Sequence, residues 1–222
     1  MHVPDGFVGN GVNAATFVIS GAVCAMAVER AGKTMGEKQV PLMGITAAFI
    51  FAAQMLNFPV AAGTSGHFLG ASMAALLLGP LNACLVMAVV LVIQCLLFAD
   101  GGITAIGTNI FNMGVVGGLG GWGAFKLIKT LGPKTRSWHM VSTAVASWFS
   151  IVLSASCCAV ELSLSGTSAL SVALPAMAGV HAIIGIGEAI ITATVISVVM
   201  AVRPDLLDGG TLSPATGGVP QK

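Results

Sequence analysis

The sequence predicts an all-α integral membrane protein: a bundle of seven transmembrane helices with its N-terminus outside and its C-terminus in the cytoplasm. Of the 222 residues, 56% are apolar and only 8% are charged, against about 25% charged in soluble domains. Mean hydropathy is +0.96, and long apolar runs recur along the chain. With a net charge of +1, the chain lacks the basic surface that binds nucleic acid. A soluble fold and a nucleic-acid partner are therefore excluded.

The apolar runs mark the expected helices in chain order. A transmembrane helix needs about 20 residues to cross a hydrocarbon core about 30 Å thick. The chain also has 29 glycines, and small residues let membrane helices pack closely. The runs lie at about 12–28, 40–57, 68–98, 105–125, 140–160 and 172–202.

The run at 68–98 predicts two short spans rather than one. As a single helix it would be about 46 Å long at about 1.5 Å per residue, which exceeds the hydrocarbon core. Gly79-Pro80 stands near its middle, and a proline inside a helix removes a donor and clashes with the preceding turn. We therefore expect a tight hairpin there, with spans at about 66–79 and 81–98, which brings the count to seven.

The distribution of charge supports seven spans with the N-terminus outside. Cytoplasmic loops carry an excess of Lys and Arg, and this count places every basic residue on the cytoplasmic side. They are Arg30, Lys33, Lys38, Lys126, Lys129, Lys134, Arg136, Arg203 and Lys222. The predicted outer ends carry Asp5, Asp100 and Glu161 instead. We expect one transmembrane domain over 1–203 and a flexible cytoplasmic tail over 204–222, which is polar and rich in Gly and Pro.

The N-terminus carries the most specific functional pattern. It lacks the basic n-region of a signal peptide, and a bulky second residue normally blocks removal of Met1, so we expect a free Met1 amine followed by His2. That amine, the His2 amide nitrogen and the imidazole can close two fused chelate rings on one ion. Cu(II) and Ni(II) favour such planar nitrogen sites. His2 alone would pass for incidental, but His67 lies on the same predicted face and offers a fourth nitrogen.

Polar residues within the apolar runs are candidates for supporting roles. His181 and Glu188 stand seven residues apart, so they share one face of the last predicted helix. A charged side chain at the centre of a membrane helix costs about 2.5–3.5 kcal/mol on insertion scales and usually has a partner. The two form either a pair that supports a binding site or a polar clamp between helices. Asn109 is expected to bond a loop or a nearby histidine, with helix packing as its alternative.

Ser65 and His181 leave an enzyme alternative open. A Ser–His pair can perform nucleophilic catalysis, so the loop Gly63-Thr64-Ser65-Gly66 with His181 would suit an intramembrane serine protease. Turn chemistry between spans explains the same loop. The hypotheses are separable, because a protease needs Ser65 and the metal site needs His2.

Four segments along the chain are similar to one known family. They are Met1-His2-Val3-Pro4-Asp5-Gly6, Ser65-Gly66-His67, Phe98 to Asn109, and Asn112-Met113-Gly114. Together they resemble the CbiM/NikM family, the substrate-binding components of energy-coupling factor (ECF) transporters for cobalt and nickel, over most of residues 1–203. The Met-His start combined with His67 is the most specific part of the resemblance.

The resemblance implies a metal site, a substrate and a fold. The family has seven spans and binds Co²⁺ or Ni²⁺ as its transported substrate, with no organic cofactor and no enzymatic activity. In this chain Met1 would give its amine, His2 its amide and imidazole nitrogens, and His67 an imidazole, in a square-planar site. The residues expected around these ligands are Asn109, Ser65, His181 and Glu188.

The resemblance also implies partners. Family members work in the bacterial inner membrane with a transmembrane coupling (T) component and two cytoplasmic ATPases, which hydrolyse the ATP, and often with a small extra membrane subunit. Val3-Pro4-Asp5 differs from the start of some cobalt members, so the choice between cobalt and nickel stays open. A component that binds an organic vitamin is a further alternative, and its binding would survive an extended N-terminus.

Overall fold

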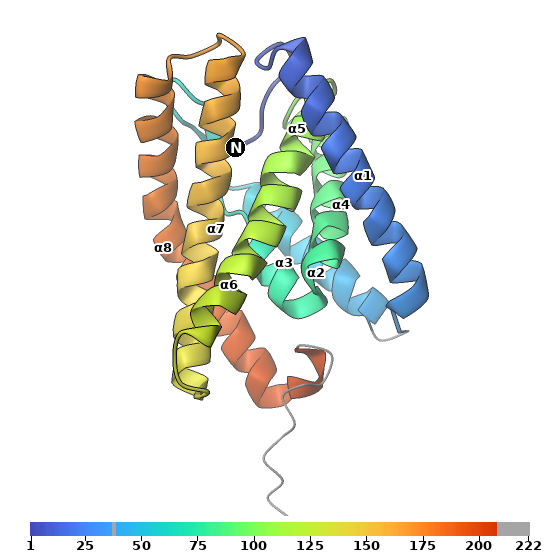
Figure 1. The fold of residues 1–222 in the computed structure, drawn as a ribbon. Helices are drawn as coiled ribbons and strands as arrows, with labels where there is room; N and C mark the ends of the chain where they lie inside the picture. The colour runs from blue at the N-terminus through green and yellow to red at the C-terminus, as the bar shows by residue number, and fades with distance from the viewer. Residues whose placement is uncertain (37–38, 208–222) are drawn as a thin grey trace, which may run out of the picture.

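The computed structural model describes residues 1–36 and 39–207, and these are helical apart from loops and one short hairpin (Figure 1). The elements are α1 (Asn10–Thr34), α2 (Gln39–Gln54), β1 (Phe58–Pro59), β2 (Ser65–Gly66), α3 (Ala71–Leu78), α4 (Pro80–Phe98), α5 (Ile106–Ile110), η1 (Phe111–Leu119), α6 (Gly120–Thr130), α7 (Arg136–Leu164), α8 (Leu170–Val202) and η2 (Pro204–Leu206). Within the described ranges, the four helices α1, α4, α7 and α8 are long and apolar enough to cross a membrane.

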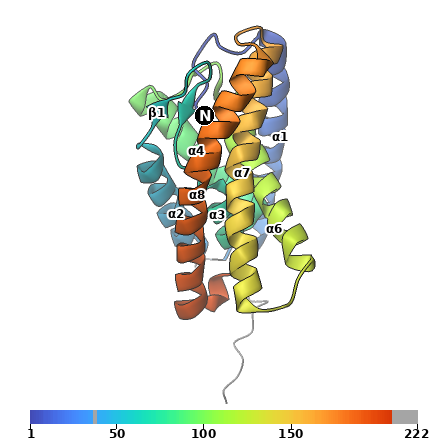
Figure 2. The same ribbon diagram turned by 90° about the vertical axis from the view of Figure 1, so that its left-hand side faces the viewer.

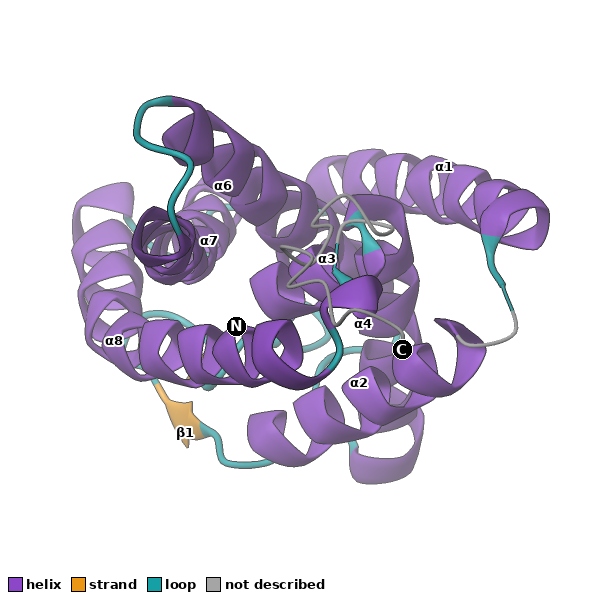
Figure 3. Cartoon of the chain, turned by 90° about the horizontal axis from the view of Figure 1, so that it is seen from below, coloured by secondary structure: helices purple, strands orange, loops and turns teal. Residues whose placement is uncertain are grey.

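The helices form a bundle with α7 and α8 on one side and α1 on the other (Figure 1). Seen along the bundle, α6, α7 and α8 lie together, while α2 and α4 lie beside each other across the molecule (Figure 3). Helices α7 and α8 pack closely because Gly185 has no side chain: a Cβ there would lie 2.8 Å from Trp148 Cδ1 and 3.1 Å from Ile151 Cγ2. Large apolar side chains such as Phe17 and Ile190 point outward, as a lipid-facing surface requires.

The expected hairpin inside the run at 68–98 is confirmed. Helix α3 ends at Leu78, Gly79 adopts φ +85°, and Pro80 opens α4 at a position where its missing N–H costs no helical hydrogen bond. The predicted span over 66–79 is nevertheless helical only from 71 to 78. Eight residues rise about 12 Å, so α3 is short and every one of its residues is buried.

The predicted helix at 105–125 is present as one continuous helical segment, α5–η1–α6, from 106 to 130. Its middle part, η1, is a π-helix, a wider helix that is rare and often marks functional sites. The η1 residue Asn112 donates its side-chain N–H to Glu161 on α7. Gly117 brings η1 close to α7, since a Cβ there would lie 2.9 Å from Ser154 Oγ. The segment therefore lies against the centre of the bundle.

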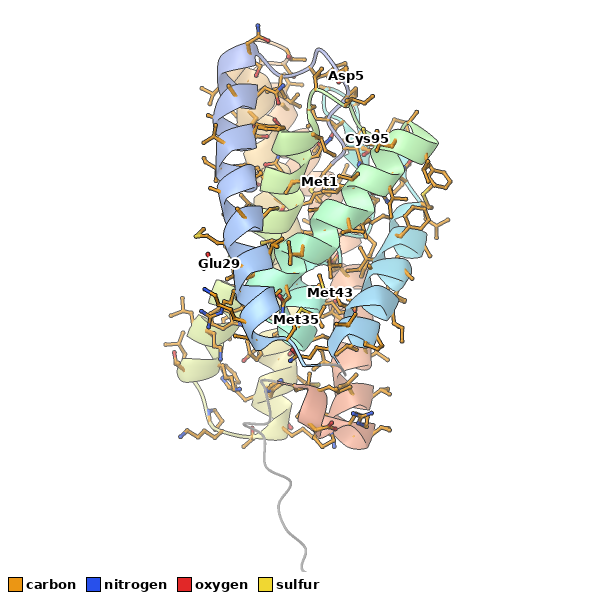
Figure 4. The ribbon with its side chains drawn as sticks, turned by 90° about the vertical axis from the view of Figure 1, so that its right-hand side faces the viewer. Met1, Asp5, Glu29, Met35, Met43 and Cys95 are labelled. Atoms are coloured by element: carbon orange, nitrogen blue, oxygen red, sulfur yellow. The ribbon has the colours of Figure 1, made fainter. Side chains whose placement is uncertain are left out.

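The two ends of the bundle differ in charge. Met1, Asp5 and Cys95 lie in one half of the molecule, whereas Glu29 and Met35 lie in the other (Figure 4). The β1–β2 hairpin lies at the same end as the N-terminus (Figure 2), and it pairs Phe58 with Gly66 and Pro59 with Ser65. The basic helix termini, at the ends of α1, α6 and α8 and the start of α7, gather at the opposite end.

The predicted tail begins with structure. Residues 204–206 form η2, and Leu207 is buried, so the described structure includes four residues beyond the expected domain end at 203. The remainder of the predicted tail, 208–222, lies outside the described residues.

Candidate metal centre

The first residues of the chain enter the bundle instead of extending from it. Met1 and Val3 are 0% exposed and His2 is 3% exposed, and the N-terminus lies inside the ring of helices when viewed along the bundle (Figure 3). Asn109 holds this segment in place: its Oδ1 accepts the Val3 N–H at 2.8 Å, and its Nδ2 donates to the Val3 carbonyl at 3.2 Å. The Asn109 amide thus pairs with the Val3 backbone as a neighbouring β-strand would. This pairing fixes the position of Met1 and His2.

Further hydrogen bonds join the N-terminal segment to the loop after α4. The Asp5 carboxylate accepts both the backbone N–H of Thr104 at 2.7 Å and its hydroxyl at 2.5 Å. The Gly102 N–H donates to the Val3 carbonyl at 2.8 Å. This approach requires glycine, because a Cβ at Gly102 would lie 2.7 Å from the carbonyl carbon of Pro4. The loop therefore covers the buried N-terminus.

The β1–β2 hairpin and the residue after it bring the remaining groups to the Met1 amine. That amine donates to the Ser65 carbonyl and, at 2.8 Å, to Ser65 Oγ, and it lies 2.9 Å from His67 Nε2. The His2 N–H donates to Ser65 Oγ at 3.0 Å. The rings of His2 and His67 are 4.6 Å apart between centroids. All three predicted ligand residues thus meet at one point, and Ser65 lies directly against them.

The geometry suits a planar nitrogen site. Metal–nitrogen bonds of about 2.0–2.1 Å place neighbouring nitrogens of a square plane about 2.8–3.0 Å apart, and the Met1 amine and His67 Nε2 are 2.9 Å apart. Both ring nitrogens of His2 are buried without a hydrogen-bond partner, so either is free to bind a ligand. The described residues contain no cluster of three or more His, Cys, Asp or Glu that could hold a metal. Main-chain nitrogens would have to complete the donor set here.

Burial keeps the nitrogen donors uncharged. It lowers the pKa of the Met1 amine from 8.0 to about 5 and the pKa of the His2 imidazole from 6.5 to about 3, because a protonated group loses hydration in the interior. Metal ligands must be deprotonated. At neutral pH the Met1 and His2 donors are therefore neutral and hold free lone pairs.

His67 is fixed by its own backbone neighbour. The side chain is 1% exposed, and Nδ1 lies 2.7 Å from the Phe68 carbonyl. A carbonyl only accepts hydrogen bonds, so Nδ1 carries the proton and Nε2 keeps its lone pair toward the Met1 amine. Such bonds to the distal ring nitrogen set the tautomer of metal-binding histidines.

Glu188 acts at the start of α3 and does not contact the Met1–His2–His67 cluster. Its carboxylate accepts the N–H groups of Leu69 at 2.6 Å and Gly70 at 2.7 Å, which are otherwise unpaired donors at a helix N-terminus. These contacts join α8 to the start of α3, and a supporting role of Glu188 at a binding site stays a prediction. Because Leu69 follows His67 by two residues, these contacts also set where His67 stands.

His181 lies on the same buried face of α8 as Glu188, with Nδ1 2.7 Å from the Met177 carbonyl. A serine protease pairs Ser Oγ with a histidine ring nitrogen, but His181 Nε2 is buried without a hydrogen-bond partner. Ser65 Oγ instead accepts hydrogen bonds from Met1 and His2. The protease alternative therefore has no structural support.

Sequence patterns did not indicate the groups around the mouth of the site. A cleft of about 670 Å³ opens at this end of the bundle, with His2 and Ser65 at its wall. Asp100 also lines it, with Oδ2 3.7 Å from His2 Nε2. In the sequence, Asp100 stands in a predicted outer loop with no basic neighbour. That position alone does not predict a contact with His2.

Comparison with known proteins identifies the family. The model of the family described as "Cobalt uptake substrate-specific transmembrane region", CbiM, matches residues 2–206. The chain belongs to the CbiM family. A putative fused nickel transport protein NikMN of Archaeoglobus fulgidus is 41% identical over 210 residues, covering 94% of this chain and 68% of that protein.

Other relatives carry related names. A putative metal transport protein of Haloquadratum walsbyi is 39% identical, covering 96% of this chain and 98% of that one. The cobalt transport protein CbiM of Geobacter sulfurreducens is 30% identical, covering 93% and 61%. The crystal structure of a truncated transition metal transporter superimposes with a TM-score of 0.84 at 34% identity, covering 90% of this chain and 99% of that chain. This CbiM-family chain is thus a membrane component of cobalt or nickel transport, with relatives named as transport proteins, and a multi-pass membrane protein.

Proposed function

We propose that this chain is the substrate-binding component of an ECF-type transporter that captures Co²⁺ or Ni²⁺ from outside the cell. The metal binds in a square plane of nitrogens from the Met1 amine, the His2 amide and imidazole, and His67. The observation that carries the proposal is the 2.9 Å separation of the Met1 amine from His67 Nε2, beside a buried His2 ring without hydrogen-bond partners. Binding replaces the amide proton of His2, which Ni²⁺ and similar ions promote.

The chemistry of the donor set explains its selectivity. Hard ions such as Mg²⁺ and Ca²⁺ prefer oxygen ligands, and Zn²⁺ prefers tetrahedral ligation. A planar nitrogen site disfavours both groups. Cu²⁺ binds such a site at least as strongly as Ni²⁺, so availability rather than affinity excludes it.

Transport requires partners. The family description calls this region substrate-specific, and we propose that a T component and two cytoplasmic ATPases couple ATP hydrolysis to release of the metal, with a small extra membrane subunit as an optional partner. The proposed topology has seven spans in the cell membrane, with α3 and α4 counted separately. It has the N-terminal end outside and the C-terminus and the basic end in the cytoplasm. The separation of the basic helix termini from the N-terminal cleft supports this orientation.

The deciding experiment inserts one Gly between Met1 and His2. Every side chain remains, but the fused chelate rings cannot close. Calorimetric titration of the purified native protein with Ni²⁺ and Co²⁺ should show one ion per chain, and the insertion should abolish binding. The matched control inserts a Gly beside Gly36, which is exposed at the other end of the bundle, and should bind as the native protein does.

Other results would reject the proposal. Equal binding by the native protein and the His2 insertion would rule out the N-terminal chelate. If neither binds metal, a vitamin-binding component becomes the better hypothesis. Loss of function in Ser65→Ala with full function in His2→Ala would instead favour the protease.

A further inference from the structure

The covalent geometry of His2 decides which of its ring nitrogens can join the chelate. The ring that the amide nitrogen closes through Cα, Cβ and Cγ is six-membered when Nδ1 binds the metal. Closure through Nε2 would need a larger and strained ring. Metal on Nδ1 leaves Nε2 on the far side of the imidazole, and in a neutral ring that nitrogen carries the proton. A buried N–H of this kind needs an acceptor.

Asp100 supplies the nearest carboxylate. Its Oδ2 lies 3.7 Å from His2 Nε2, and its side chain is 17% exposed, at the wall of the cleft. A hydrogen bond requires about 2.7–3.2 Å, so the two groups are less than 1 Å from bonding. A movement of His2 Nε2 toward Asp100 by about 0.5 Å or more would bring the two atoms within this range.

The backbone and a neighbour hold Asp100 in this position. Ala99 adopts a left-handed conformation, φ +52°, that ends α4 and turns the chain toward the N-terminal segment. The Asp100 N–H then donates to the Gln94 carbonyl at 3.1 Å. Asn57 Nδ2 donates to Asp100 Oδ2 at 2.8 Å. Three features therefore orient the Asp100 carboxylate: the strained backbone of Ala99, the backbone bond at the end of α4, and the side-chain bond from Asn57.

We propose that Asp100 is the positioning residue of the metal centre: its carboxylate accepts the Nε2–H of His2, which holds Nδ1 toward the metal. This inference rests on the proposed function and deepens it. Carboxylates that orient metal-binding histidines in this way fix the ring and raise its basicity. The competing explanation is that Asp100 only attracts cations to the cleft through its charge, and Asp5 offers a direct comparison.

Asp5 is a matched control within the same cleft. Thr104 donates both of its hydrogen bonds to Asp5 Oδ1, so Asp5→Asn removes a charge while keeping the oxygen that accepts them. Asp100→Asn removes the same charge but also weakens the acceptor for His2 Nε2–H. Both variants therefore remove one negative charge from the cleft, but only Asp100→Asn alters the contact with His2.

The test measures Ni²⁺ affinity of both variants at about 0.01 M and about 1 M ionic strength, which shortens the Debye length from about 30 Å to about 3 Å. Asp100→Asn should weaken binding by about 10–100-fold at both salt concentrations. Asp5→Asn should weaken it mainly at low salt, and the loss that remains at about 1 M, where its bonds from Thr104 stay weakened, should be smaller than that of Asp100→Asn. Asp100→Glu, which restores a carboxylate, should recover binding in part. Melting temperatures of the metal-free proteins establish that each variant is folded.

The outcomes separate this inference from the proposed function. If the native protein binds Ni²⁺ and the His2 insertion does not, but Asp100→Asn and Asp5→Asn behave alike at both salt concentrations, Asp100 acts by charge alone and the inference is wrong. Should Asp100→Glu bind no better than Asp100→Asn, the carboxylate contact is also refuted. Failure of the native protein to bind metal would overturn the proposed function itself.

Discussion

Glu188→Gln is expected to destabilise the protein and to weaken its metal site from a distance. The carboxylate is 1% exposed, and its two oxygens accept the N–H groups of Leu69 and Gly70 at 2.6 and 2.7 Å. A hydrogen bond to a charged group contributes about 1.5–3 kcal/mol. Gln keeps one oxygen and replaces the other with an NH₂ group, which faces a backbone donor and cannot accept from it.

The expected loss follows from this count. Removing one charge-assisted bond and neutralising the other costs about 2–3 kcal/mol. For a chain of this size, melting temperature falls by about 2–4 °C per kcal/mol, so Glu188→Gln should melt roughly 4–12 °C below the native protein. Ni²⁺ affinity should fall as well, because the start of α3 also positions His67, two residues before Leu69.

Thermal unfolding in detergent and calorimetric titration with Ni²⁺ measure the two effects. Thr194→Val is the matched control, since Thr194 is exposed on the same helix and its hydroxyl bonds only the carbonyl of Ile190. Such surface changes alter stability by about 0.5 kcal/mol or less. If Glu188→Gln melts with the control and binds Ni²⁺ like the native protein, Glu188 does not hold the start of α3 and this reasoning is wrong.

The remaining predictions concern the N-terminal segment. Because the folded Met1 amine has a pKa of about 5 and the exposed amine one of 8.0, the unfolded chain binds more protons between these values. Stability of the metal-free protein should therefore rise from pH 5 to pH 8, and a flat series of melting temperatures would contradict a buried amine. Gly102→Ala should displace the N-terminus and reduce Ni²⁺ affinity, whereas Gly11→Ala, with open space around its Cβ, should not; equal calorimetric affinities would refute the close packing. Ser65→Ala removes an acceptor from two N–H groups, of which the metal-bound site keeps only that of Met1, so Ni²⁺ affinity should change by about tenfold or less, while His2→Ala should abolish binding; the reverse order would exclude the chelate.

The sequence predicted the helices well where apolar runs have clear ends. The break at Gly79-Pro80 was confirmed at the residue, because the effect of proline on a helix is local. The extent of α3 was not predicted, since the residues before it form β2 and a loop that depend on Phe58 and Glu188. Hydropathy cannot distinguish a buried loop from a buried helix. The count of seven spans and the orientation of the chain stay predictions.

The sequence indicated the residues that meet at the candidate site, but not all of the groups that hold them in place. His2 and His67 are identified by their chemistry and by facing the same side, and the structure brings them together. Asn109 was expected to bond a loop, and it bonds Val3. The position of Asp100 beside His2 was not predicted, because this contact depends on a turn at Ala99 that no sequence pattern indicates.

The N-terminal segment has a consequence for the order of assembly. It is made before the rest of the bundle, yet Val3 bonds a residue 106 positions later and the Phe7 carbonyl accepts a bond from Thr167, 160 positions later. Contacts between such distant residues form late, because the loops that close them carry the largest entropy cost. The amine therefore stays unplaced until most of the chain has entered the membrane. A metal ion at the proposed site would then bind only the completed fold and stabilise it by mass action, so ion capture would also report that assembly has finished.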